Sequence, residues 1–367
     1  MDKRIYYIDN LRVFLTILVI LHHIAMTYSS TGELWYFEDM DSTYEFTNFI
    51  LTAFVFINQS FFMGLFFFLS GYFTPNAYDQ KGPKLFLKDR YIRLNTPIIF
   101  YIFFLSPVIQ FTAQEKKNLS FGHFYKSKIL SLESIEIGPL WFVLALLIFN
   151  CMYLLVRIVG KGELSYKNKQ FPKVPTLFII SFSLGILAFL VRLIFPVGEM
   201  IVGLQVSYFP SYIFLYIAGI MAYRQKWLDS IPKKTVKIWR RIALFVSPLL
   251  VIGLILLPKG NLNGGFNLQS LLYALWEPFV GIGICIVLLD GFRKYGNQTS
   301  LFTKTLSSTA YTVYIIHSLI IVVYSRILYD ISLHPLLKFG IVGTLGIITC
   351  FLVATVICKI PYTKRIL

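Results

Sequence analysis

The chain has 367 residues and a formal net charge of +16; 56% of its residues are hydrophobic and only 14% are charged. A soluble domain would hold about 25% charged residues, so this composition excludes a soluble protein and predicts a multi-span membrane protein. The basic residues lie in alternate loops between apolar segments, which is typical of membrane topology. A nucleic-acid partner is therefore not expected.

Ten apolar segments are predicted to cross the membrane, which makes the fold an all-α, polytopic integral membrane bundle. We expect one transmembrane domain over residues 1–367, because no stretch between the spans is long and apolar enough to form a core of its own. The predicted spans are Leu11–Ser29, Phe49–Phe73, Leu94–Phe111, Leu140–Ile158, Thr176–Phe195, Tyr208–Tyr223, Ile242–Leu257, Leu268–Leu289, Ser308–Leu328 and Pro335–Cys358.

The alternation of basic loops also predicts the orientation, with both termini in the cytoplasm of a multi-pass cell-membrane protein. The first outer loop is acidic instead, and carries Glu33, Glu38, Asp39, Asp41 and Glu45. No small-residue cleavage site follows the first apolar segment, so we expect it to be retained as a span. The four cysteines lie in apolar segments without metal-type spacing, and no metal site is predicted.

The first span contains an arginine and two histidines, which are costly in lipid and normally face a cavity or partner helices. On a helix, Arg12 and His23 lie about 16 Å apart along the axis and on one face, whereas His22 points about 80° away. His23 is favoured for function, with a structural hydrogen bond as the alternative. Arg12 could instead reach the interface, and Asp9 could pair with it across one turn.

Near the cytoplasmic end of the second predicted span lies Ser70-Gly71, which allows either close helix approach or backbone contact with a ligand. Arg90 and Arg93 follow three residues apart, so a helix would present both guanidinium groups on one side, where they suit phosphate groups. Ordinary anchoring at the cytoplasmic interface is the alternative for two arginines alone.

Later spans hold three further candidates. Trp141 begins the fourth span, where it could simply belong to the aromatic belt. Glu277 lies near the middle of the eighth span as a lone carboxyl beside a proline, and a functional role is favoured there. In the ninth span, Tyr314 and His317 share one face at mid-depth, and a hydrogen bond between helices is as good an explanation as catalysis.

These residues together resemble acyltransferase family 3 of membrane proteins, which modifies surface and periplasmic glycans. The resemblance lies in Arg12 and His23 after an Asp-x-Leu-Arg start, the Phe-Phe-Phe-Leu-Ser-Gly-Tyr-Phe run, Arg-x-x-Arg, Leu-Trp-Phe and Tyr-x-x-His, in the family's order. The His-His pair with Tyr28, and Trp276-Glu277, are more similar to the glucan-modifying branch.

The resemblance implies transfer of an acyl group, acetyl or succinyl-like, from cytoplasmic acyl-CoA to a hydroxyl of an extracytoplasmic glycan or related envelope molecule. It implies His23 as the catalytic residue and links Arg12, Arg90 and Arg93 to acyl-CoA. Acyl-CoA is expected as a co-substrate with no bound cofactor. The extra outer domain of some family members has no counterpart here, so a separate extracytoplasmic partner protein is one alternative.

We hypothesise that His23 is a general base and that Glu277 or His317 polarises it or relays its proton. The competing hypothesis is a transporter or flippase, since buried His, Glu and Arg side chains could line a substrate path. Such a transporter would be expected to contain paired internal repeats, and the first span has no equivalent in the second half of the chain.

Overall fold

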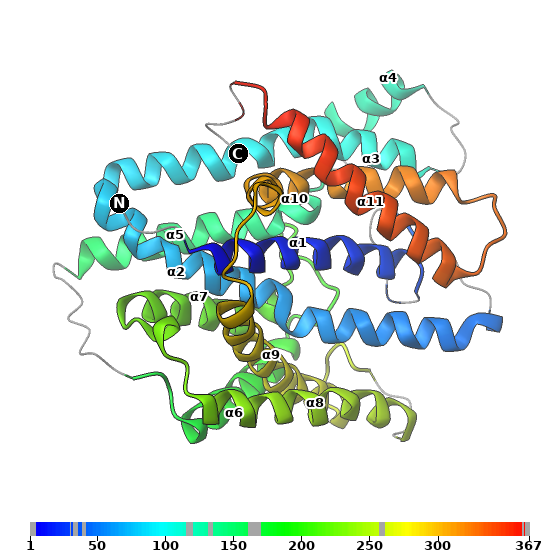
Figure 1. Ribbon diagram of the computed structural model, residues 1–367. Helices are drawn as coiled ribbons and strands as arrows, with labels where there is room; N and C mark the ends of the chain where they lie inside the picture. Colours follow the sequence, from blue (N-terminus) through cyan, green and yellow to red (C-terminus); the bar gives the residue numbers. More distant parts are fainter. Residues whose placement is uncertain are drawn as a thin grey trace. The chain divides into compact units, whose positions relative to one another are not determined.

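The computed structural model describes residues 5–29, 31, 36–38, 42–114, 120–130, 135–160, 170–256, 261–361 and 363. Over these ranges the chain forms helices and no β-strand, which confirms the all-α prediction (Figure 1). The α-helices are α1 (Tyr6–Thr27), α2 (Glu45–Phe100), α3 (Ser106–Ala113), α4 (Phe121–Phe124), α5 (Trp141–Val159), α6 (Val174–Arg192), α7 (Phe209–Arg224), α8 (Lys233–Leu256), α9 (Leu268–Tyr295), α10 (Leu301–Ile327) and α11 (Pro335–Ile357).

Eight helical elements in the described ranges are long and apolar enough to cross a membrane, so a multi-span protein is confirmed but the count of ten is not. The predicted second and third spans share one of these elements, Glu45–Ala113. The predicted seventh span falls in α8, which is not among the eight and begins with a strongly basic stretch. Residues 1–4 and 364–367, and the acidic Glu33, Asp39 and Asp41, lie outside the described residues, so the orientation stays a prediction.

A sharp kink separates the two predicted spans inside α2. Gly82 has φ 68° and ψ 171°, a left-handed backbone conformation that only glycine adopts readily. Pro83 follows and has no N–H to donate to a helix. The chain changes direction at this point (Figure 1), so the Gly-Pro pair acts as a turn within an otherwise continuous helical element.

Packing divides the chain into two compact units, each built from separate stretches of sequence. Unit 1 consists of Met1–Leu11, Gln59–Asp89 and Ala145–Gln298. Unit 2 consists of Arg12–Asn58, Arg90–Leu144 and Thr299–Leu367. Neither unit is a continuous segment, and the single domain expected over the whole chain stays a prediction.

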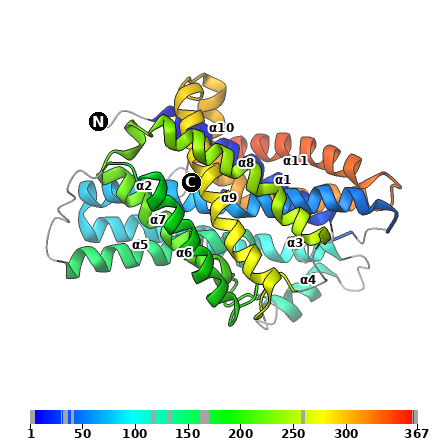
Figure 2. The same cartoon turned by 90° about the horizontal axis from the view of Figure 1, so that it is seen from below.

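In unit 1, α9 packs against both α6 and α8 (Figure 2). The α2 segment and α7 approach so closely that a Cβ on Gly71 would collide with the backbone oxygen of Tyr216, and one on Gly219 with that of Phe68. Close helix approach, one of the two roles considered for Gly71, is therefore what the structure shows. In unit 2, α10 packs against α11 and α3.

Gly71→Ala is expected to lower the free energy of unfolding by about 1–3 kcal/mol, because the added methyl meets backbone that cannot rotate away. The matched control is Gly340→Ala in α11, where nothing lies within 4 Å of the added carbon. Thermal unfolding of the purified protein in detergent compares the two. Equal melting temperatures for the two variants would contradict the tight contact.

Candidate functional site

Two histidines from distant parts of the sequence meet in unit 2. His23 of α1 and His317 of α10 have ring centroids 5.0 Å apart. The Nε2 atom of His317 lies 3.3 Å from the Nδ1 atom of His23. His317 is fully buried, whereas His23 is only partly buried. The two histidines predicted as candidates on separate spans thus form one pair.

The hydrogen bonds of this pair define which nitrogens carry protons. The Nδ1 atom of His23 lies 2.8 Å from the carbonyl oxygen of Val19, and Nδ1 of His317 lies 2.7 Å from that of Tyr314. A carbonyl oxygen can only accept, so both Nδ1 atoms carry hydrogen in the neutral rings. The single Nδ1 hydrogen of His23 is then shared between the closer Val19 carbonyl and the Nε2 atom of His317, and the lone pair of His23 is on its own Nε2.

His22 has a different setting from its neighbour. Its side chain is buried, with 4% of its surface exposed, and its ring packs edge-on against His23 with centroids 5.6 Å apart. The predicted difference in function between the two adjacent histidines stays a prediction. His23 contacts His317 through the hydrogen bond described above.

Three side chains of α10, spaced three residues apart, each contact a different segment of unit 2. The Tyr311 hydroxyl donates to the carbonyl of Arg93 at 3.1 Å, the Tyr314 hydroxyl donates to the carbonyl of Pro139, and His317 contacts His23. Because residues three apart lie near one another on a helix surface, α10 connects all these segments along one side. Helix α10 therefore positions the histidine pair.

The turn that Tyr314 contacts is held in place by a second tyrosine. Gly138 begins the short Gly138–Leu140 turn with φ 46°, and a Cβ there would overlap the Tyr101 side chain. The Tyr101 hydroxyl also lies 3.4 Å from Ser318 Oγ, next to His317 in sequence. A glycine is required here for its backbone conformation and for its lack of a side chain.

The predicted arginines and the tryptophan also belong to unit 2. Arg12 is partly buried on α1. Arg90 and Arg93 lie in the part of α2 that comes after the kink at Gly82. Trp141 is the first residue of α5 and packs edge-on against Phe142, whose ring lies 5.9 Å from that of Tyr314. Trp141 thus borders the residues that hold α10, while a role in binding stays a prediction.

The remaining candidates, Asp9, Ser70, Gly71 and Glu277, belong to unit 1. Glu277 was predicted as a lone carboxyl, and this is wrong: it forms a buried ion pair with Arg192 at the end of α6. The Arg192 side chain is fully buried and lies over the rings of Tyr208 and Tyr273, at 5.2 and 4.7 Å from their centroids. The charge of Glu277 is thus compensated within its own unit, and a proton relay through it stays a prediction.

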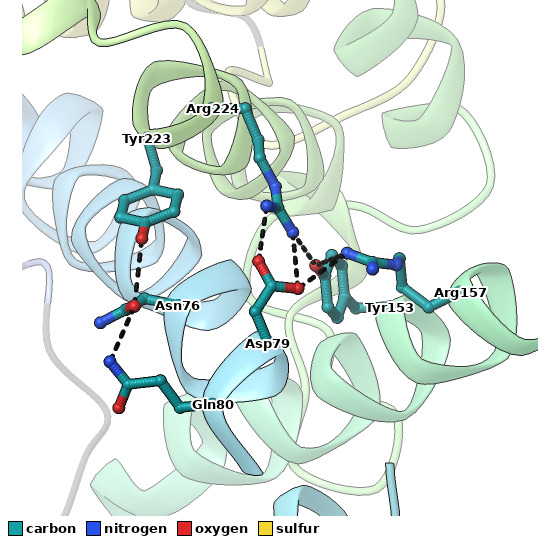
Figure 3. A network of polar contacts seen from close by, with 7 residues as sticks. All are labelled: Asn76, Asp79, Gln80, Tyr153, Arg157, Tyr223 and Arg224. Carbon is teal, nitrogen blue, oxygen red and sulfur yellow. Dashed lines mark hydrogen bonds and ion pairs between the residues drawn. The ribbon is translucent and has the colours of Figure 1, made fainter. Parts of the chain in front are cut away.

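A polar network that the sequence did not reveal joins α2, α5 and α7 in unit 1 (Figure 3). Asp79 accepts from Arg224 at 2.5 Å and from Arg157 at 3.3 Å, and both guanidinium groups also donate to the hydroxyl of Tyr153. The arginines stand in the last turns of α5 and α7, where they also offset the helix dipoles. The network fastens the ends of these helices together.

Comparison with known proteins gives one family match over nearly the whole chain. The family model described as "Acyltransferase domain" matches residues 5–359. Glucans biosynthesis protein C of Escherichia coli K12 is 30% identical over 194 residues, which cover 50% of this chain and 47% of that protein. The proteins of the same name from the O1:K1 and O139:H28 strains match to the same extent. The match spans about half the length of these relatives, and no solved structure matches.

Proposed function

The chain belongs to the acyltransferase family whose domain covers residues 5–359, and we propose that it is an O-acyltransferase of the membrane. It would move an acetyl or succinyl-like group from acyl-CoA to a hydroxyl of an extracytoplasmic glycan. The observation that carries this proposal is the hydrogen-bonded pair of His23 and His317.

The pair has the geometry of a base and the group that orients it. A general base needs an accessible lone pair, and a partner that fixes its ring and stabilises the charge it gains. His23 is the more exposed of the two rings and has its lone pair on Nε2. When Nε2 takes a proton, the resulting cation can share its Nδ1 hydrogen with His317 and the Val19 carbonyl.

The proposed step conserves every atom and proton. The acceptor hydroxyl oxygen attacks the carbonyl carbon of the thioester while its proton moves to Nε2 of His23. An ester C–O bond forms and the C–S bond breaks. The proton on His23 then passes to the departing thiolate, which leaves as CoA with a free thiol, and the histidine is ready for another cycle.

The arginines of unit 2 support an acyl-CoA donor. CoA carries several phosphate groups, for which guanidinium groups are good ligands. Arg12 lies on the His23 face of α1 and about 16 Å away along the helix axis, a span that a long pantetheine arm could cover. Arg90 and Arg93 add further positive charge, and we assign all three to the donor.

The glycan acceptor is proposed from the relatives. Their printed name, Glucans biosynthesis protein C, refers to glucans, and the motifs of the first span and of Trp276-Glu277 resemble that branch. A glucan hydroxyl is therefore the first acceptor to test. Protein in lipid nanodiscs is given radiolabelled acetyl-CoA or succinyl-CoA with glucose oligosaccharides, and label in the sugar is measured. Donor-dependent transport without transfer would favour the flippase instead.

His317→Leu is expected to lower kcat about tenfold to a hundredfold and to leave the KM for acyl-CoA unchanged, because a slightly misplaced base loses much of its effect. His317→Asn keeps an acceptor atom and is expected to recover part of kcat. The same transfer assay measures both variants. If Leu and Asn were equally active, an orienting hydrogen bond from His23 would be ruled out.

A further inference from the structure

The ends of α1, α10 and α11 meet in unit 2 beyond the histidine pair. Four residues after His23, the Thr27 carbonyl accepts a hydrogen bond from the backbone N–H of Glu38 at 3.1 Å. Arg326 lies nine residues after His317 near the end of α10, and Lys338 stands in the first turns of α11. By helix rise, Thr27 lies about 6 Å beyond His23 along α1, and Arg326 lies about 14 Å beyond His317 along α10.

Charged and aromatic side chains are concentrated at this place. The Glu38 carboxylate accepts from Lys338 Nζ at 2.7 Å and from the Tyr36 hydroxyl at 3.5 Å. The Arg326 guanidinium lies 5.6 Å from the Tyr36 ring centroid and 4.6 Å from that of Tyr329. Burial raises the pKa of the Glu38 carboxyl, and the hydrogen bond from Lys338 opposes this shift.

One polar atom of the same cluster, Nη1 of Arg326, is buried without a hydrogen-bond partner among the residues that the structure describes. The hydroxyls of Tyr28 and Ser325 are at most 1% exposed and interact with each other. A buried donor such as this Nη1 atom rarely stays without a partner, and a bound ligand would supply one. By contrast, Tyr329 is 38% exposed, and one face of its ring lies against the Arg326 guanidinium.

We propose that Tyr36, Glu38, Arg326 and Tyr329 form a binding subsite for a neutral sugar of the acceptor. A carboxylate accepts from sugar hydroxyls, a guanidinium donates to them, and a tyrosine ring covers the apolar face of a pyranose. The Glu38 carboxylate is paired with the Lys338 ammonium, and a neutral ligand can bind without breaking this ion pair. The subsite rests on the proposed function, since it gives the acceptor a place on the helices that carry His23 and His317.

The first test measures binding of cellotetraose, laminaritetraose and maltotetraose to the full chain in nanodiscs, without any acyl donor. At least one tetrasaccharide is expected to bind, and Glu38→Gln is expected to weaken it about tenfold to a hundredfold, the worth of a hydrogen bond to a charged group. Tyr329→Ala is expected to weaken it about tenfold, whereas Tyr329→Phe keeps the ring and binds as the natural chain does.

Matched controls separate binding from folding. Tyr295→Ala removes a tyrosine that is 85% exposed at the end of α9, and it is expected to change nothing. Glu38→Gln and Tyr329→Ala are expected to elute as the natural chain does in size-exclusion chromatography, which reports on folding independently of activity. An aggregated elution profile together with lost sugar binding would show that the substitutions damaged the fold, and would overturn a binding role.

The outcomes for the subsite and for the proposed function are distinct. Equal sugar binding by the natural chain and both variants overturns the subsite. So does a natural chain that binds none of the three neutral tetrasaccharides. A natural chain that binds only a heparin tetrasaccharide, which is anionic, also overturns a subsite for a neutral sugar. Absence of acyl transfer by a natural chain that binds sugar through Glu38 and Tyr329 overturns the transferase proposal and leaves the subsite supported.

Discussion

Replacement of His23 with alanine is expected to reduce kcat for acyl transfer about 10²–10⁴-fold, the usual contribution of a positioned general base. The loss arises because Nε2 of His23 is the atom proposed to take the acceptor proton, and His317, which is fully buried, presents its own Nε2 to His23. The variant should still insert, because alanine is more apolar than histidine in a membrane helix. Transfer of label from acyl-CoA to glucan, normalised to protein in the membrane fraction, measures the effect.

His22→Ala is the matched control, since it removes the same side chain one position earlier on α1. A smaller loss is expected there, because His22 packs edge-on against His23 on another face of the helix, whereas His23 is the ring proposed to take the proton. Retained activity of the His23 variant would remove the basis of the proposed mechanism. If His22→Ala lost more acyl transfer than His23→Ala, His22 would be the better candidate for the general base.

The second large effect is expected from the ion pair between Arg192 and Glu277. Either Arg192→Met or Glu277→Leu alone should lower the free energy of unfolding by about 3–5 kcal/mol, because each leaves a buried charge without its counter-ion. The tyrosine rings over Arg192 attract a cation but cannot replace a carboxylate. Thermal unfolding in detergent measures the difference.

The double variant Arg192→Met with Glu277→Leu removes both charges and is expected to recover most of the lost stability, since an apolar pair of similar volume is often as stable as a buried ion pair. If the double variant also regains acyl transfer, Glu277 is a structural residue. A stable double variant without transfer would instead support the predicted catalytic role of Glu277. Single variants as stable as the natural chain would show that the pair is not a buried ion pair.

The relative positions of candidate residues could be predicted from the sequence where the residues lie on the same helix. The 3.6-residue periodicity separates His22 from His23 and places Arg12 on the His23 face, and α1 includes all of these positions. The i, i+3 spacing likewise relates Tyr314 to His317 on α10. These relations are local, so a helix assignment is sufficient to derive them.

Relations between helices could not be derived in the same way. Glu277 was interpreted as unpaired although Arg192 lies inside the predicted fifth span, and an arginine in an apolar segment was the available signal. Nothing in the spacing of two residues 85 positions apart indicates that they meet. The Asp79 network and the cluster around Glu38 were missed for the same reason, since each joins elements whose packing is non-local.

The span count shows a further limit of reasoning from apolar segments. Hydropathy correctly located apolar stretches on both sides of Gly82, but the helical element continues through the kink. The two predicted spans on either side of Gly82 are thus joined in one kinked element, which is counted once among the eight. A Gly-Pro pair between two apolar stretches was the local signal for this turn.

The meeting of α1 with α10 has a consequence for synthesis. His23 belongs to α1, and His317 lies 294 residues later in the chain, in α10. At about 5–20 residues per second, His317 is added about 15–60 s after His23. During this interval the hydrogen-bonded pair cannot form. The proposed base is therefore incomplete until α10 has been made, and a chain that ends before α10 is expected to transfer no acyl group.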